Sequence, residues 1–362
     1  MKTVVGLDAK ELAEATGAQF GGAVDAPVSG VRIDSRQVSD GDVFIPLPGA
    51  KFDGHSFLEA AADQGAGGVF AEAGKVSPKR LESLRERGVA VFQVSNCLKA
   101  LQDVARHVRR RVRVPVVAIT GSTGKTSTKD MVAGVLGQEM AVVAAKRSFN
   151  NEVGLPLTLL DIRDDTEAVV VEMAMRGLGE IRHLAEIAEP DVGVVTNIGV
   201  AHVGRVGSRG ALVAAKSELV EAIPAGGDVV LNRDDPSTPS LRRKSRAKVV
   251  TFGEGAAADV RAEEVALDEL GRASFVIAGI GCRDRVGLPF PGRHQIANSL
   301  AAACCGRVLG VAGESIVKGL AGCRLSGLRM DLYSTDDNQV ILDDCYNANP
   351  VSMEAALETL AV

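Results

Sequence analysis

One stretch of the chain constrains the fold more than any other, because a strand pattern, a glycine loop and a helical pattern follow one another there. Residues 114–119 are apolar and mostly β-branched, and residues 120–124 form the loop. Lys125-Thr126-Ser127 then open a helical pattern. In this order the loop N–H groups and the helix N-terminus form an anion site. The stretch therefore predicts an α/β fold that carries a phosphate-binding loop.

The loop departs from the commonest P-loop spacing, because Ile119 stands where that pattern has its first glycine. The loop reads Gly121-x-x-Gly124-Lys125-Thr126. Two interpretations stay open at this point. In one, Lys125 reaches the terminal phosphates of a nucleoside triphosphate and the Thr126 hydroxyl binds Mg²⁺. In the other, the stretch is an ordinary glycine turn that leads into a capped helix. The order of strand, glycines, lysine and threonine favours the first.

Composition and charge exclude several classes of protein. A chain of 362 residues is expected to form two or three domains. The net charge of −5 argues against a general nucleic-acid binder, whose surface would be basic. The basic run at residues 109–113 closes a helical pattern, which favours a helix C-terminus over an RNA or phosphate site. We find no signal peptide and no apolar run long enough to span a bilayer, so no membrane insertion is expected.

The cysteines favour a reducing compartment. None of the six forms a Cys-x-x-Cys pair, and Cys304-Cys305 lie in an alanine-rich helical pattern. A zinc site or a disulfide framework is therefore not expected. We expect buried, reduced thiols in a cytoplasmic, monomeric protein.

Three regions separate along the chain: residues 1–113, 114–327 and 328–362. The first mixes short strands and helices, which predicts an α/β domain. The second alternates buried-strand patterns with helical ones, which predicts a mostly parallel, doubly wound sheet with helices on both faces. The alternation at residues 261–286 is more typical of antiparallel strands. The third region holds one strand pattern at 340–342 and one helix from about Ser352, too little to bury a core alone.

Three further residues are candidates for the chemistry. Glu172 ends an apolar strand, where a carboxylate is placed to hold Mg²⁺ beside a phosphate loop. His202 follows another apolar strand, in Thr196-Asn-Ile-Gly-Val-Ala-His202. Lys216 lies on a helical stretch. Taken singly, the three would be a surface glutamate, a loop histidine and a solvated lysine. Together with Thr126 they make a metal role plausible.

These residues, with several longer segments, resemble the Mur ligases, the ATP-dependent enzymes that build the peptidoglycan stem peptide. The short loop 120–127 is similar to the phosphate loop of this family. Asp34-Ser35-Arg36, Gly41-Asp42-Val-Phe44 and Phe52-Asp53-Gly54-His55-Ser-Phe57 resemble the UDP-sugar domain of two members. The segments 148–160 and 343–353, rich in asparagine, are similar to the member that adds the final dipeptide. The Thr-Thr-Pro and Asp-Tyr-Ala-His elements of the third-residue ligase do not occur at these places.

The resemblance implies a role for each matching residue. ATP phosphates would lie on Gly121, Ser122, Thr123, Gly124, Lys125, Thr126 and Ser127. Mg²⁺ would be held by Thr126 and Glu172, with His202 at a second metal and Lys216 as a carbamate that acts as a metal ligand. Asn298 would contact adenine, and Arg329 and Asp344 would contact the nucleotide from the hinge side. Asn150, Asn151 and Thr158 would line the substrate path, and Ser35, Arg36, Asp53, Gly54 and His55 would face the UDP end.

The reaction implied is the ATP-dependent joining of D-alanyl-D-alanine to UDP-N-acetylmuramoyl-tripeptide through an acyl phosphate. The alternatives are another amide ligase of the superfamily, such as the third-residue or a folylpolyglutamate-type enzyme, and a truncated, non-catalytic nucleotide- or UDP-sugar-binding protein.

The sequence departs from the family pattern at three places. The family's third, Rossmann-like domain is expected to continue past residue 362, so that residues 328–362 would be only its first strand and helix. Met173-Ala-Met-Arg176 replaces a common Gly-Ala-Asn, and Gln295 stands where asparagine is common. Neither of these two changes removes a candidate metal ligand.

Overall fold

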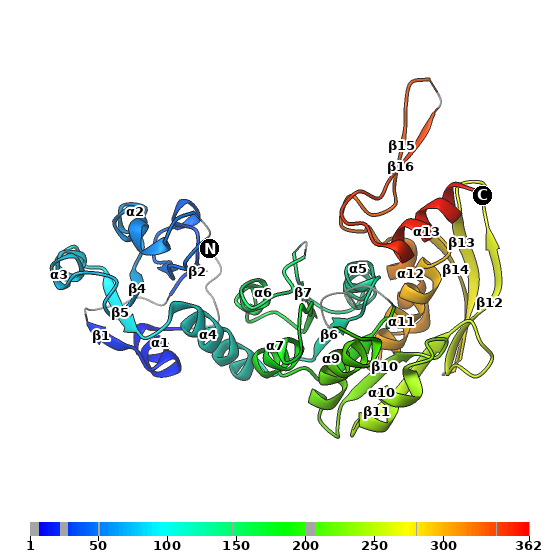
Figure 1. Cartoon of the computed structure of the whole chain (residues 1–362), viewed down its shortest axis with the longest axis horizontal. Helices are drawn as coiled ribbons and strands as arrows, with labels where there is room; N and C mark the ends of the chain where they lie inside the picture. The colour runs from blue at the N-terminus through cyan, green and yellow to red at the C-terminus, as the bar shows by residue number, and fades with distance from the viewer. Residues whose placement is uncertain are drawn as a thin grey trace. The chain divides into compact units, whose positions relative to one another are not determined.

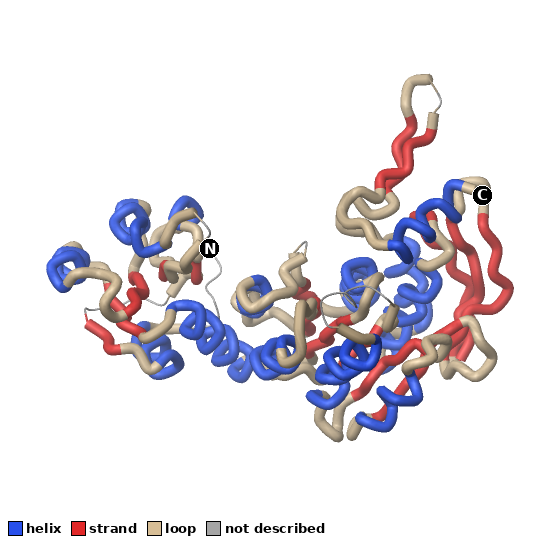
Figure 2. Tube along the Cα trace, in the orientation of Figure 1, coloured by secondary structure: helices blue, strands red, loops and turns tan. Residues whose placement is uncertain are grey.

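The computed structural model describes residues 7–21, 28–49, 51–146, 148–199, 207–279, 281–337 and 339–361. The chain divides into two compact units, one of Met1–Arg113 with Glu152–Asp165 and one of Val114–Asn151 with Thr166–Val362. Each unit has its own sheet, which Figures 1 and 2 show as separate groups of strands. The segment Glu152–Asp165, which includes α6 (Gly154–Leu159), folds with the first unit and packs on its helix α4.

The first unit is built on a five-stranded sheet in the order β1-β5-β4-β3-β2. Its strands are parallel except β1, which runs antiparallel to β5. The strands are β1 (Gln19–Gly21), β2 (Val31–Arg32), β3 (Val43–Phe44), β4 (Gly68–Glu72) and β5 (Ala90–Val94), and the helices are α1 (Ala9–Thr16), α2 (Leu58–Asp63), α3 (Pro78–Glu86) and α4 (Cys97–Arg111), with 3₁₀ turns η1 (Ser35–Gln37) and η2 (Gly54–Phe57).

Alternation along the strands gives this sheet an apolar core on both faces. Val69 and Val91 pack with Leu58 of α2 and with Leu81 and Leu84 of α3. The intervening residues of the strands point to the opposite face. There the rings of Phe70 and Phe92 stack at 4.8 Å, and Phe20 of β1 stacks on Phe92 at 5.0 Å.

The second unit holds a nine-stranded sheet in the order β14-β13-β12-β11-β10-β9-β6-β8-β7. Every pair from β7 to β12 is parallel, and β12, β13 and β14 pair antiparallel. The strands are β6 (Val116–Thr120), β7 (Val142–Ala144), β8 (Ala168–Glu172), β9 (Val192–Val195), β10 (Asp228–Asn232), β11 (Lys248–Gly253), β12 (Val260–Leu267), β13 (Arg272–Gly279) and β14 (Cys282–Pro291).

Helices pack on this sheet in two groups. The first group packs together and contacts β7, β8 and β10 to β14, and consists of α5 (Lys125–Leu136), α11 (Gln295–Val308) and α12 (Gly313–Ala321). The second group contacts β6, β9 and β10, and consists of α7 (Glu180–Ala188), α9 (Arg209–Ala222) and α10 (Thr238–Lys244). The main apolar core joins the first group to the sheet, with Met131 and Val135 of α5 and Leu300 of α11 completely buried. The predicted doubly wound α/β fold is thereby confirmed.

Three strands lacked a sequence signal. β1, β7 and β15 (Asp331–Ser334) are three or four residues long. Such short strands form because a neighbour offers a pairing edge, which the local pattern does not reveal. The helix expected from Ser352 is α13 (Pro350–Leu360), which begins earlier because Asn349 and Ser352 form a capping box and Pro350 fits the first turn.

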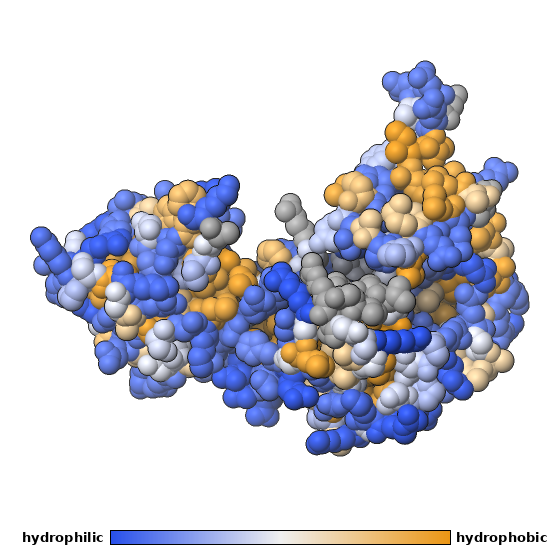
Figure 3. Space-filling model, in the orientation of Figure 1, coloured by the Kyte–Doolittle hydropathy of each residue, from blue (hydrophilic) through white to orange (hydrophobic). Residues whose placement is uncertain are grey.

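The end of the chain exposes apolar side chains. β15 pairs with β16 (Val340–Asp343) in a two-stranded antiparallel sheet. Figure 3 shows apolar surface over these strands and near α13. Its members are Tyr333, Val340, Ile341, Leu357 and Leu360, each at least half exposed. Of the cysteines whose side chains the structure describes, Cys97, Cys304, Cys305 and Cys323 are buried and free, whereas Cys345 is exposed, contrary to the expectation of buried thiols.

Candidate nucleotide site

The glycine loop lies where the order of strands reverses. It follows β6, and β6 has β8 on one side and β9 on the other. All three strands are parallel, so their carboxyl ends meet at one edge of the sheet. Open α/β sheets bind ligands at such a reversal. The expected site residues Lys125, Thr126 and Glu172 gather at this edge.

Two glycines are required by neighbouring side chains. Gly121 has φ 155°, and a Cβ there would lie 1.8 Å from Oγ1 of Thr196. Gly124 has φ 78°, and a Cβ there would lie 2.4 Å from Oδ1 of Asn298. Any other residue would strain the backbone and displace these side chains. The glycines therefore let the ends of β9 and α11 close against the loop.

The first turn of α5 leaves N–H groups for an anion. Gly124 is the N-cap of the helix, and no side chain caps it. The N–H groups of the cap and first turn have no acceptor inside a helix. With the positive end of the helix dipole behind them, they suit phosphate oxygens. A nucleotide phosphate thus fits the loop by its backbone alone.

Lys125 curls back over the loop. Its Nζ donates to the carbonyl oxygens of Gly121 at 2.9 Å and of Ser122 at 3.4 Å. Burial lowers the pKa of this ammonium group, opposed by the nearby charge of Glu172 and assisted by that of Arg329. A bound phosphate would restore the charge that burial opposes. The ammonium group therefore lies over the loop, and its phosphate role stays a prediction.

Two oxygen donors adjoin the loop. The Thr126 hydroxyl donates to Oε2 of Glu172 at 2.8 Å, and Nδ2 of Asn150 donates to Oε1 at 2.8 Å. Glu172 is almost completely buried, so its carboxylate depends on these bonds. A hydroxyl and a carboxylate are ligands that Mg²⁺ prefers. The pair fits one side of a magnesium site, although the described residues hold no cluster of three or more His, Cys, Asp or Glu.

Lys216, another expected metal ligand, is buried in α9. It is 1% exposed. Burial lowers its pKa well below the usual range, and the charge of Lys125 lowers it further. The amine is therefore held toward its neutral, nucleophilic form. His202, expected at the second metal, lies outside the described residues.

Asn298, the residue expected to contact adenine, is hydrogen-bonded to helix α5 and to Gln295. Its Oδ1 accepts from the Thr128 hydroxyl at 3.2 Å, and its Nδ2 donates to Gln295 at 2.8 Å. The amide keeps one donor hydrogen for a base, because each Nδ2 carries two. The unexpected Gln295 thus orients Asn298.

The two hinge-side candidates lie among charged and aromatic neighbours. The guanidinium of Arg329 stacks over the ring of Tyr346 at 4.0 Å, and its Nε is buried without a partner among the described residues. Burial raises the pKa of Asp344, against the N–H of Met330 and the charge of Arg329. The charge of Arg329 also lowers the pKa of Lys125.

The substrate-path candidates are divided between the two units. Asn150 binds Glu172, as described, whereas its neighbour Asn151 is exposed. Thr158 belongs to the first unit, where it is buried and its hydroxyl donates to the Gly154 carbonyl at 3.1 Å. Asn150 is therefore in direct contact with the metal candidate Glu172.

The charged candidates at the expected UDP end are bonded to residues nearby in the first unit. Arg36 is exposed and makes two side-chain bonds to Asp34, at 2.9 and 2.7 Å, while Ser35 lies half-buried between them. This pairing lowers the pKa of Asp34.

His55 is buried with both ring nitrogens engaged. Its Nδ1 lies 2.6 Å from Asp53, and its Nε2 accepts the Glu72 N–H at 3.0 Å. Because Nε2 accepts an N–H, the ring proton that faces Asp53 is on Nδ1. Bonds from the His55 backbone and side chain lower the pKa of Asp53 to about 2. Gly54 is needed because a Cβ would meet the Leu47 backbone at 2.7 Å.

Sequence reasoning missed Thr196 and Asn197, which hold the phosphate loop from the end of β9. Thr196 Oγ1 donates to the Thr123 carbonyl at 2.6 Å, and Asn197 Oδ1 accepts the Thr123 N–H at 3.1 Å. The segment had been singled out only for His202. The missed signal was a polar pair directly after a parallel strand beside the loop strand.

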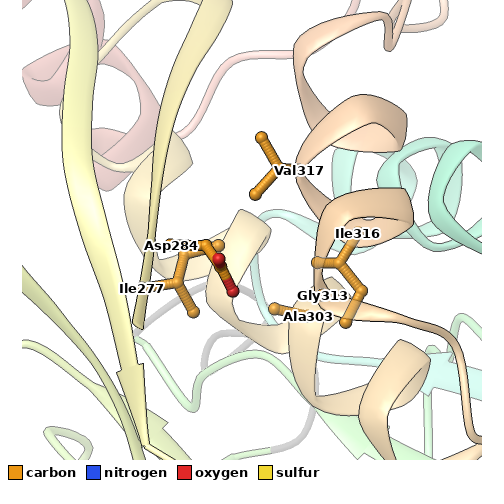
Figure 4. A pocket seen from close by; sticks show the side chains of 6 residues that line it. All are labelled: Ile277, Asp284, Ala303, Gly313, Ile316 and Val317. Carbon is orange, nitrogen blue, oxygen red and sulfur yellow. The ribbon is translucent and has the colours of Figure 1, made fainter. Parts of the chain in front are cut away.

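A small cavity elsewhere in the second unit does not suit a polar ligand. Figure 4 shows its lining, which comes from β13, β14, α11 and α12: Ile277, Asp284, Ala303, Gly313, Ile316 and Val317. Oδ2 of Asp284 lies 2.8 Å from where a Cβ of Gly313 would stand. The carboxylate thus faces the start of α12, and the positive end of this helix stabilises it. We interpret the cavity as a packing gap.

No helix among the described residues has the length and apolar character needed to cross a membrane.

Comparison with known proteins gives two family matches. A model described as the Mur ligase middle domain matches residues 119–306, and one described as the Mur ligase family, catalytic domain, matches residues 27–109. The first match contains the phosphate loop, Glu172, Lys216 and Asn298.

Two curated relatives carry the same name. A UDP-N-acetylmuramoyl-tripeptide–D-alanyl-D-alanine ligase of Bacillus subtilis is 37% identical, over 91% of this chain and 70% of its own length. The protein of that name in Mycobacterium tuberculosis is 39% identical, over 91% and 68%.

Solved structures agree with this result. The structure of MurF from Acinetobacter baumannii matches with TM-score 0.89 and 30% identity, over 99% of this chain and 77% of that one. MurF from Thermotoga maritima in complex with ADP matches with TM-score 0.80 and 29% identity, over 92% and 74%.

Proposed function

We propose that this chain, which belongs to the Mur ligase family, joins D-alanyl-D-alanine to the terminal carboxylate of UDP-N-acetylmuramoyl-tripeptide with ATP as the energy source. The observation that carries the proposal is the phosphate loop with its bonded Thr126–Glu172 pair, 2.8 Å apart. The substrates follow from the shared name of relatives that are 32–39% identical. The cytoplasm, where ATP is available, is the proposed compartment.

The proposed reaction has two steps. An oxygen of the tripeptide's terminal carboxylate attacks the γ-phosphorus of ATP, ADP leaves, and an acyl phosphate forms. The amine of D-alanyl-D-alanine then attacks the acyl carbon through a tetrahedral intermediate. The bond from carbon to the phosphate oxygen breaks, phosphate leaves, and the amine loses its proton as the amide forms. One carboxylate oxygen thereby ends on the released phosphate.

The protein's part in this chemistry is to place charge and to position the reactants. The loop N–H groups and Lys125 would face the phosphates, where negative charge shifts during the transfer. Positioning two bound reactants replaces a bimolecular encounter. No nucleophilic serine or cysteine is needed.

Mg²⁺ is a proposed companion of the nucleotide. Thr126 and Glu172 would hold it, and the ion would offset charge on the phosphate oxygens when bound. Asn150 fixes the second oxygen of Glu172, which sets the direction of the first. The paired donors in a buried place support this role.

Lys216 is proposed to serve as a carbamate. The neutral amine attacks the carbon of CO₂, its nitrogen gains the carboxylate and loses a proton, and a buried amine becomes an anionic ligand. The lowered pKa of Lys216 and its burial support this assignment. His202 is kept as the proposed second-metal histidine.

The first unit is proposed to bind the UDP end of the substrate. There the loops around Ser35 and Gly54 are fixed by the Asp34–Arg36 and Asp53–His55 pairs. These pairs shape the loop backbones, and Arg36 keeps donors that a diphosphate would use. Asn151 and Thr158 stay candidates for the substrate path, and Arg329, Asp344 and Asn298 for the nucleotide.

The test is phosphate release by the purified protein with UDP-N-acetylmuramoyl-tripeptide, MgATP and one amine. We expect release with D-alanyl-D-alanine and none with diaminopimelate, lysine or glutamate. If the tripeptide carboxylate carries ¹⁸O, one label should appear in the released phosphate. Release with a single amino acid but not with the dipeptide would refute the proposed substrate, and phosphate without label would refute the acyl phosphate.

A further inference from the structure

The peptide bond between Thr123 and Gly124 is held from outside the phosphate loop. Thr196 Oγ1 donates to the Thr123 carbonyl at 2.6 Å, and Asn197 Nδ2 approaches the same oxygen at 3.3 Å. Asn197 also grips the rest of Thr123. Its Nδ2 donates to the Thr123 hydroxyl at 2.9 Å, and its Oδ1 accepts the Thr123 N–H at 3.1 Å.

These hydrogen bonds from Thr196 and Asn197, called the grip below, determine which N–H groups of the loop remain available to an anion. The N–H of Thr123 goes to Asn197 Oδ1, and the N–H of Ser122 goes to the Asn197 carbonyl at 3.0 Å. The next N–H groups, from Gly124 onward, belong to the cap and first turn of α5. They have no acceptor inside the helix.

The carbonyl contact also orients an N–H. In a planar trans peptide, the C=O of one residue and the N–H of the next point in opposite directions. When Thr196 and Asn197 hold the Thr123 carbonyl toward β9, the Gly124 N–H must point away from β9. Gly124 is a glycine at φ 78°, so its own backbone permits other orientations of this peptide. The orientation therefore depends on the side chains that grip it.

We propose that Thr196 and Asn197 are positioning residues for nucleotide binding, which lock the Thr123–Gly124 peptide with its N–H toward the phosphates and its carbonyl away from them. This inference rests on the proposed function. Without the grip, a flipped peptide would direct a carbonyl oxygen at the anionic phosphates. The same two residues thus supply a donor and remove a repulsive acceptor.

The end of β10 holds the grip in place. Asn232 Nδ2 donates to the Thr196 carbonyl at 3.1 Å, and the carboxylate of Asp235 accepts the Ile198 N–H. Gly121 is also required, because a Cβ at this position would block the approach of the Thr196 hydroxyl to the loop. A chain of contacts from β10 through β9 therefore reaches the phosphate loop.

The test compares Thr196→Val with Thr196→Ser in binding of MgADP by calorimetry. Valine keeps the shape of threonine and removes the hydroxyl, whereas serine keeps the hydroxyl. We expect about 10-fold weaker binding for the valine variant. The serine variant should stay within about 2-fold of the wild type, because its hydroxyl still reaches the carbonyl.

Thr251→Val is the matched control for stability. Thr251 is also buried, and its hydroxyl bonds to Asp259 at 2.7 Å, away from the loop. We expect this variant to unfold at lower denaturant concentration and to bind MgADP as the wild type does. If Thr196→Val does not fold, Asn197→Ala gives the reading, with weaker MgADP binding expected.

Two outcomes overturn the inference: wild-type affinity in Thr196→Val or, if that variant does not fold, in Asn197→Ala, and an equal loss in the valine and serine variants. A wild-type protein that binds no MgADP would instead refute the proposed function itself, so the two failures are distinguishable.

Discussion

The phosphate loop differs from the loops around Arg36 and His55 in which groups remain free to bind a ligand. In the phosphate loop, the Thr196 side chain after β9 holds the loop backbone, and Asn298 of α11 accepts from the Thr128 hydroxyl. The first-turn N–H groups of α5 remain for a ligand. In the first unit, the candidate side chains are themselves engaged: Arg36 binds Asp34, and His55 binds Asp53 and Glu72. The phosphate loop therefore has backbone N–H donors available for a ligand. The loops of the first unit are instead held in shape by paired side chains.

The charged side chains of the two regions also differ in how far their charges are compensated. Near the phosphate loop, burial lowers the pKa of both Lys125 and Lys216, so each lysine lacks a full counter-charge. In the first unit, bonds from His55 lower the pKa of Asp53 to about 2, so this carboxylate is already compensated. A bound anion is therefore expected to shift pKa values near the phosphate loop more than those in the first unit.

The largest expected effect is at Lys125. Lys125→Met removes the cation that would face the phosphates, and turnover should fall by about 10³-fold. The measurement is phosphate release at saturating substrates. Lys129→Met is the control, since Lys129 lies in the same helix, is buried, and donates to Ala145 instead of the loop. Should both variants lose turnover equally, the special position of Lys125 would be disproved.

An intermediate effect is expected at Gly124. Gly124→Ala combines a strained φ of 78° with a Cβ 2.4 Å from Asn298, so MgADP affinity should fall about 10-fold and stability by about 1–3 kcal/mol. Gly88→Ala is the matched control, with φ 81° and no atom within 4 Å of the added Cβ. It should lose stability by strain and keep nucleotide binding. Equal affinities in the two variants would mean that the loop does not depend on Gly124.

The phosphate loop, Glu172 and the central sheet could be predicted from the sequence, because each depends on a local pattern. Gly121, Gly124, Lys125 and Thr126 are consecutive or nearly so, and their order alone implies a strand, a turn and a helix N-terminus. Glu172 could be placed because it ends a neighbouring apolar strand. The doubly wound sheet followed from buried strands that alternate with helices.

Contacts across the sequence were not predictable. Asn197 grips Thr123 from 74 residues away, and Asn298 meets Thr128 from 170 residues away. No local pattern encodes such a pairing. The inclusion of Glu152–Asp165 in the first unit likewise depends on packing against α4, which chain order conceals.

The smallest expected effect is at Asp53. Its pKa is lowered in the fold, so its ionised form stabilises the protein above the unfolded value of about 3.9 and loses that effect as the pH falls toward about 2. Asp53→Asn should therefore be less stable than the wild type at pH 7, and the difference should shrink between pH 5 and pH 3. Urea unfolding at each pH measures it. Asp40→Asn, at an exposed aspartate, controls for the loss of one negative charge; a gap at Asp53 that stays constant with pH would contradict the account.

The most direct test of the central claim, that the loop at residues 121–127 binds a nucleotide with Mg²⁺ on Thr126 and Glu172, is calorimetric titration of the protein with ATP in Mg²⁺ and in EDTA. The wild type should bind at a single site, and Mg²⁺ should strengthen binding about 10-fold or more. Glu172→Gln should bind ATP in EDTA and lose most of the gain from Mg²⁺. No binding, or equal gains from Mg²⁺ in the wild type and in Glu172→Gln, would contradict the account.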